Sequence, residues 1–271
     1  MTAINNPQIS RLLRLLTFVE VLVVFASGAG LFFIPGSAAA LWPWELLPFN
    51  ARFLGAVYSA SFISAVMQTV HARRSPARLV TPMIFIFTAV IMILSFAYLP
   101  VFNFQRWEVW VWFLLYIIIP VNCAYHLWLY RNLPPADPTQ PSATGRAILL
   151  TQSIVLGIYG LALLLIPSLA KNFWSWQIDN FHAQLYSVTF LTPAVGAFLL
   201  TKAASKVEWL TMGLTQAVLG LFPIIGVIVV DATVKSVNWS SAGTWIWMSL
   251  FAGMLIISLW MIKESYKANH P

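Results

Sequence analysis

The stretch that decides the fold is residues 34–52, IPGSAAALWPWELLPFNAR, because it returns 132 positions later as residues 166–184, IPSLAKNFWSWQIDNFHAQ. Both copies open on an isoleucine-proline pair, carry two tryptophans at the same spacing, and end on a phenylalanine followed two residues later by alanine. Recurrence of this kind indicates two copies of one supersecondary unit.

The repeat extends to both sides of this stretch. Glu20 corresponds to Gln152. After a three-residue insertion, Asn103 and Trp110 correspond to Asn238 and Trp245 at a shift of 135. The first apolar segment therefore has a counterpart in the middle of the chain, and we expect it to be a retained helix rather than a cleaved signal peptide.

Composition identifies the solvent of most of the surface as lipid. Apolar residues make up 60% of the 271 positions and charged residues 8%, a balance that soluble domains do not have. A helix needs about 20 apolar residues to cross a bilayer. We predict an all-α, polytopic membrane helix bundle with eight transmembrane helices at residues 11–34, 52–71, 79–100, 108–130, 147–167, 182–202, 208–230 and 243–262.

The domain organisation follows from the repeat and from a proline-rich interruption. We expect a first four-helix repeat over 1–131, a cytoplasmic linker over 132–146 that contains four prolines, and a second four-helix repeat over 147–271. Each unit has an even number of helices, so both cross the membrane in the same sense. The repeats are therefore predicted to be parallel, related by an axis along the membrane normal.

Basic residues in the short loops predict the orientation. With a cytoplasmic N-terminus, the cytoplasmic side holds eleven of the 15 lysines and arginines and the other side holds Arg52, Arg106, Lys171 and Lys235. We expect both termini to be cytoplasmic. The net charge of +7 is spread over loops and forms no stripe, so nucleic acid is not an expected partner.

Ten of the 13 tryptophans fall on the predicted outer side. One interpretation is an aromatic belt at the membrane interface. The other is that the outer loops form a surface groove for a lipid-like or aromatic ligand, or for a partner. The candidate ligand-binding residues of this groove are Trp42, Trp44, Trp174 and Trp176, with Arg52 and His182 beneath them.

Arg52 has two alternative roles in this interpretation. One is to anchor a loop through an ion pair with Glu45 or Asp179. The other is to bind an anionic head group, because the guanidinium fork suits a phosphate or a carboxylate.

Polar residues inside apolar segments are functional candidates, because an unpaired charge in a membrane costs at least about 2.5–3.5 kcal/mol. Glu20 is the clearest, with Gln152 at the matching position. A proton or cation site is one interpretation; a buried, protonated carboxyl that joins helices by a hydrogen bond is the other. His71 and His126 are candidates for a shared metal or haem ligand, and neither has a histidine counterpart in the other half.

Motifs for catalysis and cofactors are missing from the sequence. It contains no closely spaced cysteine or histidine pair, no glycine-rich phosphate loop and no Gly-x-Ser-x-Gly elbow. The single cysteine, Cys123, excludes an intrachain disulfide. No cofactor is identified, and enzymatic activity has no support from the sequence.

The stretch from Ile34-Pro35 through Trp42-Pro43-Trp44 to Asn50-Ala51-Arg52 resembles a pattern of uncharacterised bacterial multi-pass proteins, broadly similar to DoxX-like four-helix families. The second copy departs from it at Ser175 and Gln184, which replace the proline and the arginine. The resemblance implies a bacterial cytoplasmic (inner) membrane and a four-helix unit, without a known reaction.

Three hypotheses of function remain open. The first is a non-enzymatic integral membrane protein that binds a lipophilic ligand or acts as a subunit of a larger membrane complex. The second is a secondary transporter or channel for a small solute, with its path between the repeats. The third is a membrane enzyme that acts on a lipid.

Overall fold

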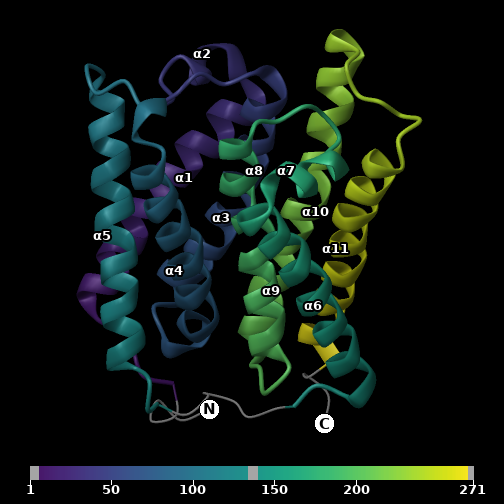
Figure 1. Cartoon of the computed structure of the whole chain (residues 1–271). Helices are drawn as coiled ribbons and strands as arrows, with labels where there is room; N and C mark the ends of the chain where they lie inside the picture. The colour runs from purple at the N-terminus through teal and green to yellow at the C-terminus, as the bar shows by residue number, and fades with distance from the viewer. Residues whose placement is uncertain (1–5, 134–139, 268–271) are drawn as a thin grey trace.

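The computed structural model describes residues 6–133 and 140–267, which form an α-helical bundle without a β-sheet (Figure 1). Eight helices are long and apolar enough to span a membrane. They are α1 (Arg11–Phe33), α3 (Pro48–His71), α4 (Arg74–Ala97), α5 (Trp107–Leu129), α6 (Ala143–Leu165), α8 (Asn180–Tyr186) continued by α9 (Val188–Leu200), α10 (Lys206–Val234) and α11 (Ala242–Lys267). The predicted fold class is confirmed.

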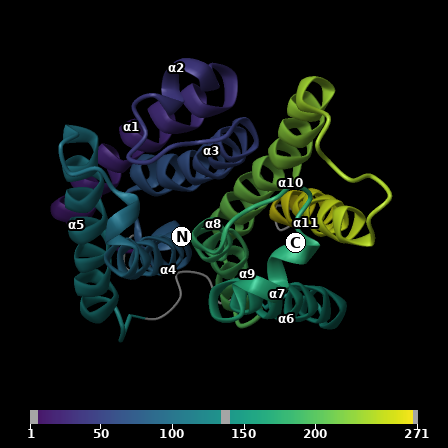
Figure 2. The same ribbon diagram turned by 45° about the horizontal axis from the view of Figure 1, so that its top comes forward.

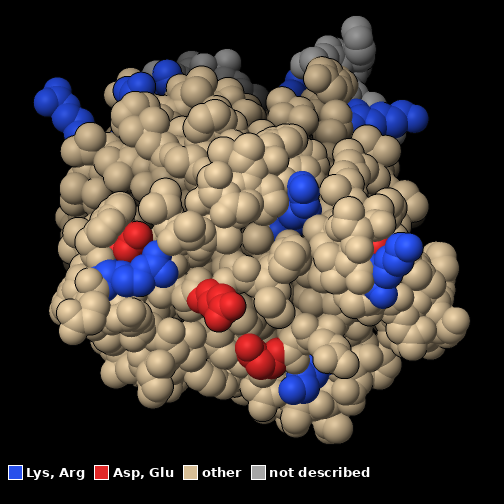
Figure 3. Space-filling model, turned by 90° about the horizontal axis from the view of Figure 1, so that it is seen from above, with Lys and Arg blue, Asp and Glu red and all other residues tan. Residues whose placement is uncertain are grey.

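Short helices connect the spans at one end of the bundle. They are α2 (Pro35–Ala39), η1 (Leu99–Val101), α7 (Pro167–Ala170) and η2 (Lys171–Phe173). We call this the tryptophan end, because Trp42, Trp44, Trp174 and Trp176 lie in its loops. Viewed from there, the surface is largely uncharged, with a few scattered acidic and basic side chains, some of which lie next to each other (Figure 3). The opposite end, which contains Arg73, Arg74, Arg78 and Arg131, is called the basic end.

Proline and serine set the boundaries of the first helix in each half. Ser10 and Ser142 cap α1 and α6 by accepting a backbone N–H three residues on. Both helices stop at an isoleucine whose ψ is near +53°, since the following proline disfavours a helical conformation there. Helix bounds differ from the predicted ones by up to five residues, as at the start of α4 (Arg74 against 79) and the end of α11 (Lys267 against 262). Differences at α3 and α6 have a local cause. The proline at the start of α3 begins that helix four residues early, and α6 begins inside the predicted linker, of which residues 134–139 lie outside the described ranges.

The two halves exchange helix contacts across the middle of the bundle. α1 packs on α3, and α10 packs on α11; between the halves, α3 packs on α10 and α4 packs on α9, while α5 lies at the edge (Figure 2). Under the predicted repeat, α3 corresponds to α9 and α4 to α10. Each cross-half contact therefore has a counterpart with the roles reversed, as a pseudo-twofold axis requires. Superposition of the two repeats stays a prediction.

Glycines allow the closest helix crossings. A Cβ added at Gly55 of α3 would lie 2.4 Å from the Phe32 backbone nitrogen, and one at Gly28 of α1 would lie 2.8 Å from the Ser59 nitrogen. A Cβ added at Gly220 of α10 would likewise lie 2.7 Å from the Leu255 backbone nitrogen of α11. Membrane helices pack through such small residues, because lipid supplies no hydrophobic drive for association.

Candidate ligand-binding site

A cavity of about 410 Å³ lies among the helices of the first half. Its walls come from α1, α3, α4 and α5, and it is closed on the far side by α9 and α10 of the second half. The lining is mostly apolar. The exposed lining residues are Ala26 of α1, Leu41 of the loop before α3, and Trp107 and Val111 of α5, so the cavity opens on the side of α1 and α5, toward the tryptophan end.

The polar part of the lining centres on Glu20, Tyr58 and Tyr116. The two tyrosine hydroxyls lie 2.7 Å apart and share one hydrogen bond. Glu20 is buried at 8% exposure. Among the described residues, none donates a hydrogen bond to its carboxyl, so the predicted burial is confirmed and the predicted hydrogen bond between helices is wrong. The carboxyl is available to a molecule in the cavity.

Further polar groups in the lining lack partners. The Trp42 indole N–H and the hydroxyls of Thr192 and Thr215 are buried and make no hydrogen bond within the described part of the chain. The indole can only donate. Pro193, also in the lining, has no N–H for the carbonyl of Thr189. Unpaired buried polar groups are costly, and a bound molecule or water that hydrogen-bonds to them removes that cost.

The corresponding region of the second half is differently built. At the shifts of 132 and 135 residues, Tyr58 and Tyr116 correspond to Phe190 and Phe251, both fully buried. Gln152, the counterpart of Glu20, exchanges two hydrogen bonds with Gln216 at 2.6 and 3.2 Å. Its amide is thus satisfied within the protein, whereas the Glu20 carboxyl is not. Glu20, Tyr58 and Tyr116 therefore have no polar equivalents at the matching positions that face a cavity, while the second half contributes Thr192 and Thr215 to the lining of the first.

The four tryptophans predicted to form a surface groove are buried, at 4–7% exposure, and pack edge to face with one another and with other rings. Only Trp42 among them lines the cavity. The prediction of an open aromatic groove is therefore wrong, because the loops fold over the bundle and carry their indoles into its core. Trp107, Trp110, Trp128 and Trp245 are each more than half exposed and match the aromatic belt instead.

Two of the buried indoles tie the halves together by reciprocal hydrogen bonds. Trp44 donates to Nε2 of His182 at 3.2 Å, and Trp176 donates to Oδ1 of Asn50 at 2.9 Å. The partners are exchanged between corresponding positions. Because the indole only donates, Nε2 of His182 accepts, and Nδ1 carries the hydrogen toward Asp179 at 2.9 Å. His182 therefore connects the two halves by hydrogen bonds and does not line the cavity.

Asp179 lies at the surface of this link. Partial burial raises the pKa of its carboxyl, but hydrogen bonds from the ring and the backbone N–H of His182 outweigh that effect, so the pKa lies below its ordinary value.

Arg52 donates to the Phe32 carbonyl at 2.5 Å, and Gln184 at the matching position donates to the Leu164 carbonyl at 2.7 Å. Each closes the last turn of the preceding helix. The predicted ion pair of Arg52 with Glu45 or Asp179 is absent from the described residues, because Asp179 pairs with His182. Arg52 thus anchors a helix end through Nη1, and head-group binding by its other N–H groups stays a prediction.

The predicted metal candidates are not brought together as a site. His71 is exposed at the end of α3, whereas His126 is fully buried. Nε2 of His126 lies 2.5 Å from the Ser10 hydroxyl, and Nδ1 lies 2.9 Å from the Asn122 carbonyl. Over residues 6–133 and 140–267, no group of three or more histidine, cysteine or acidic residues could hold a metal.

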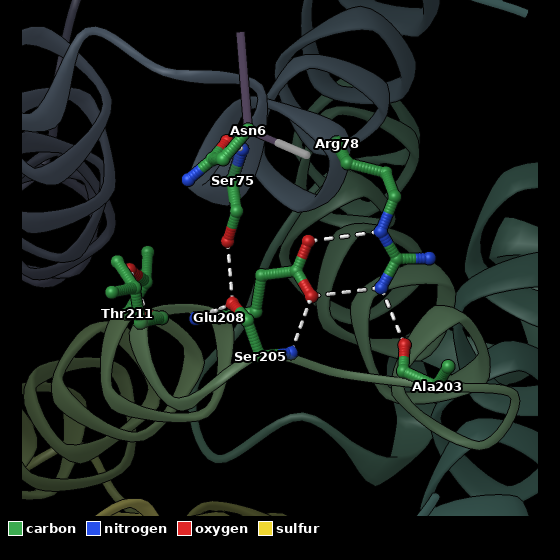
Figure 4. Close-up of polar contacts among 8 residues, drawn as sticks. Asn6, Ser75, Arg78, Ala203, Ser205, Glu208 and Thr211 are labelled. Carbon is green, nitrogen blue, oxygen red and sulfur yellow. Dashed lines mark hydrogen bonds and ion pairs between the residues drawn. The ribbon is translucent and has the colours of Figure 1, made fainter. Parts of the chain in front are cut away.

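A buried ion pair joins the halves at the basic end (Figure 4). The Glu208 carboxylate accepts from Nε and Nη2 of Arg78 at 2.9 and 2.8 Å, and from the backbone N–H of Ser205 at 2.9 Å. The hydroxyls of Ser75 and Ser205 are also hydrogen-bonded to each other. Sequence reasoning missed this cluster, because a pairing 130 residues apart depends on how the halves dock.

Sequence reasoning also missed Tyr58, Tyr116 and the threonines of the cavity. A signal was present for the tyrosines, since both stand where the other repeat has phenylalanine.

Comparison of the chain with protein-family models, with curated proteins and with solved structures finds no match in any of the three. The resemblance to DoxX-like proteins therefore stays a prediction.

Proposed function

We propose that this chain is a multi-pass membrane protein that binds a lipophilic molecule in the cavity of its first half. The observation that carries the proposal is the unpartnered set of polar groups in an otherwise apolar cavity of about 410 Å³. Pockets of about 300–1,000 Å³ with a few convergent polar groups are typical of small-molecule sites.

The chemistry of the lining indicates the ligand class. The Trp42 indole, the hydroxyl pair of Tyr58 and Tyr116, and a protonated Glu20 carboxyl all have a hydrogen to donate. A matching ligand is an apolar molecule with a hydrogen-bond acceptor, such as a carbonyl, at one end. Its route is lateral, because the exposed residues at the opening, Ala26, Leu41, Trp107 and Val111, are all apolar.

Location and orientation are part of the same proposal. We place the chain in a bacterial cytoplasmic membrane with both termini in the cytoplasm. The positive-inside rule supports this orientation, because arginines gather at the end of the bundle where α1 begins. The basic end is then cytoplasmic and the tryptophan end faces outward.

The test is to purify the full chain gently from its native membrane and identify co-purifying lipophiles by mass spectrometry and absorption. Ser61 lines the cavity, so the ring introduced by Ser61→Phe should occupy part of it and lower ligand occupancy by about tenfold or more. Tyr159→Phe, which removes an unpaired hydroxyl outside the lining, should leave occupancy unchanged. Equal occupancy in a folded Ser61→Phe variant, or a wild type without a bound lipophile, overturns the proposal.

A transporter or channel is the second proposal, because the cavity reaches α9 and α10 of the other half. Reconstituted vesicles separate the two. Movement of the identified ligand across the bilayer, abolished by Glu20→Gln, supports transport, whereas binding without movement supports the first proposal.

A further inference from the structure

A second, smaller cavity of about 190 Å³ lies at the basic end between α4 and α5. Its nine lining residues include three arginines, Arg74, Arg78 and Arg131, and none of the nine is acidic. The other polar lining residues are Thr81, His126 and Tyr130. The cavity is separate from the one proposed to bind a lipophile.

The charge of this cavity is only partly compensated. Glu208 neutralises Arg78 through two hydrogen bonds. Arg74 and Arg131 form no ion pair with an acidic residue in the part of the chain that the structure describes. Two guanidinium charges therefore remain at a small, partly enclosed site.

Arg74 is held in place but not satisfied. Its Nη2 donates to the Tyr130 carbonyl at 3.2 Å, and its guanidinium carbon lies 5.7 Å from the centre of the Tyr130 ring. Its Nε is buried and has no hydrogen-bond partner within the described ranges. A guanidinium that is oriented in this way can offer its remaining N–H groups as a fork to a phosphate.

Arg131 and its surroundings place the cavity at the membrane surface. Its guanidinium lies 4.7 Å above the ring of Trp128, which is 60% exposed, and indoles favour the level of the lipid head groups. Along the same helix, Val121, Tyr125 and Leu129 are exposed. An acyl chain can lie against this face of α5 while its head group reaches the arginines.

We propose that the cavity lined by Arg74 and Arg131 binds a phosphate group, and that its source is the head group of an anionic phospholipid. Basic pockets between membrane helices are suited to such head groups. The inference does not depend on the proposed function, because the site shares no lining residue with the larger cavity.

The test measures phospholipid binding by native mass spectrometry on the delipidated full chain in detergent. Phosphatidylglycerol should bind more tightly than phosphatidylcholine. Arg74→Gln with Arg131→Gln should weaken that binding about tenfold or more, since charge-assisted hydrogen bonds are lost. The matched control, Arg11→Gln with Arg146→Gln, removes two exposed charges near the starts of α1 and α6 and should change little.

Added inorganic phosphate tests whether the phosphate group bound at this site comes from a lipid head group or from soluble phosphate. If millimolar phosphate stabilises the wild type against heat and not the Arg74/Arg131 variant, and also displaces phosphatidylglycerol, the same site takes soluble phosphate. If phosphate has no effect, the source is the lipid. Should the double variant fail to fold, Arg131→Gln alone provides the comparison, because that side chain is exposed. Equal binding of the two phospholipids, or undiminished phosphatidylglycerol binding to the folded variants together with no phosphate effect, overturns the proposal.

Discussion

Breaking the Arg78–Glu208 ion pair should destabilise the contact between the halves strongly. The Glu208 side chain is 2% exposed and that of Arg78 is 15% exposed. Arg78→Met leaves a buried carboxylate that keeps its hydrogen bond from the Ser205 N–H, and Glu208→Gln leaves a guanidinium without a counter-ion. Each single change should cost roughly 3 kcal/mol, toward the lower limit for buried pairs because the arginine is partly exposed.

The double variant should cost much less than the two single variants together. With Arg78→Met and Glu208→Gln combined, neither charge of the pair is buried, and the amide oxygen introduced at position 208 can still accept from the Ser205 N–H. We expect a loss of about 1–2 kcal/mol and therefore a coupling energy of roughly 4–5 kcal/mol.

The assay is unfolding of the purified chain in mixed micelles with increasing denaturing detergent, followed by far-UV circular dichroism. Arg106→Met with Glu108→Gln is a matched control, because that pair lies within one segment and its arginine side chain is 33% exposed. Its coupling should stay below about 1 kcal/mol. If the Arg78 and Glu208 effects simply add, the two groups do not stabilise the interface as a pair, and the reasoning is refuted.

Gly55→Ala should destabilise the protein by about 1–3 kcal/mol through a clash with the backbone of α1. The control Gly253→Ala, whose added Cβ meets nothing within 4 Å, should be tolerated. Equal melting temperatures of the two variants would contradict the close contact at Gly55. Asp179→Asn should lower the free energy of unfolding at neutral pH, and this loss should shrink below about pH 4. The reason is that a carboxyl whose pKa is lowered in the folded state stabilises the fold above its unfolded pKa and loses that contribution as pH falls. Thermal melts that show the same loss at every pH would exclude the link to His182. Cys123 is 2% exposed and should react with a maleimide only after unfolding; rapid labelling of the native chain, measured by mass, would show that α5 packs differently.

The spans and their breaks were predictable from sequence because their causes are local. Hydropathy over about 20 residues predicts a crossing helix. A proline after Ile34 and after Ile166 ends a helix wherever it occurs. Helix starts were less accurate, because a proline such as Pro48 can begin a helix as readily as it ends one.

Local sequence did not determine which tryptophans are buried and which are exposed. An indole in a loop can lie at the membrane interface or pack in a core, and composition is the same in both cases. Trp44 and Trp176 are buried because the loops fold back over the bundle and each finds an acceptor in the other half. Trp110 and Trp245, on peripheral helices, stay exposed.

The candidate site also has one part that the sequence predicts and another that depends on tertiary packing. Sequence singled out Glu20 because a carboxyl inside an apolar segment is unusual, and this depends on one position alone. Which groups face it depends on which sides of α1, α3 and α5 meet, and apolar periodicity gives little guidance when lipid and core are equally apolar. The pairing of Arg78 with Glu208, the cavity beside Glu20 and the cavity that gathers Arg74 with Arg131 were therefore decided only by tertiary packing.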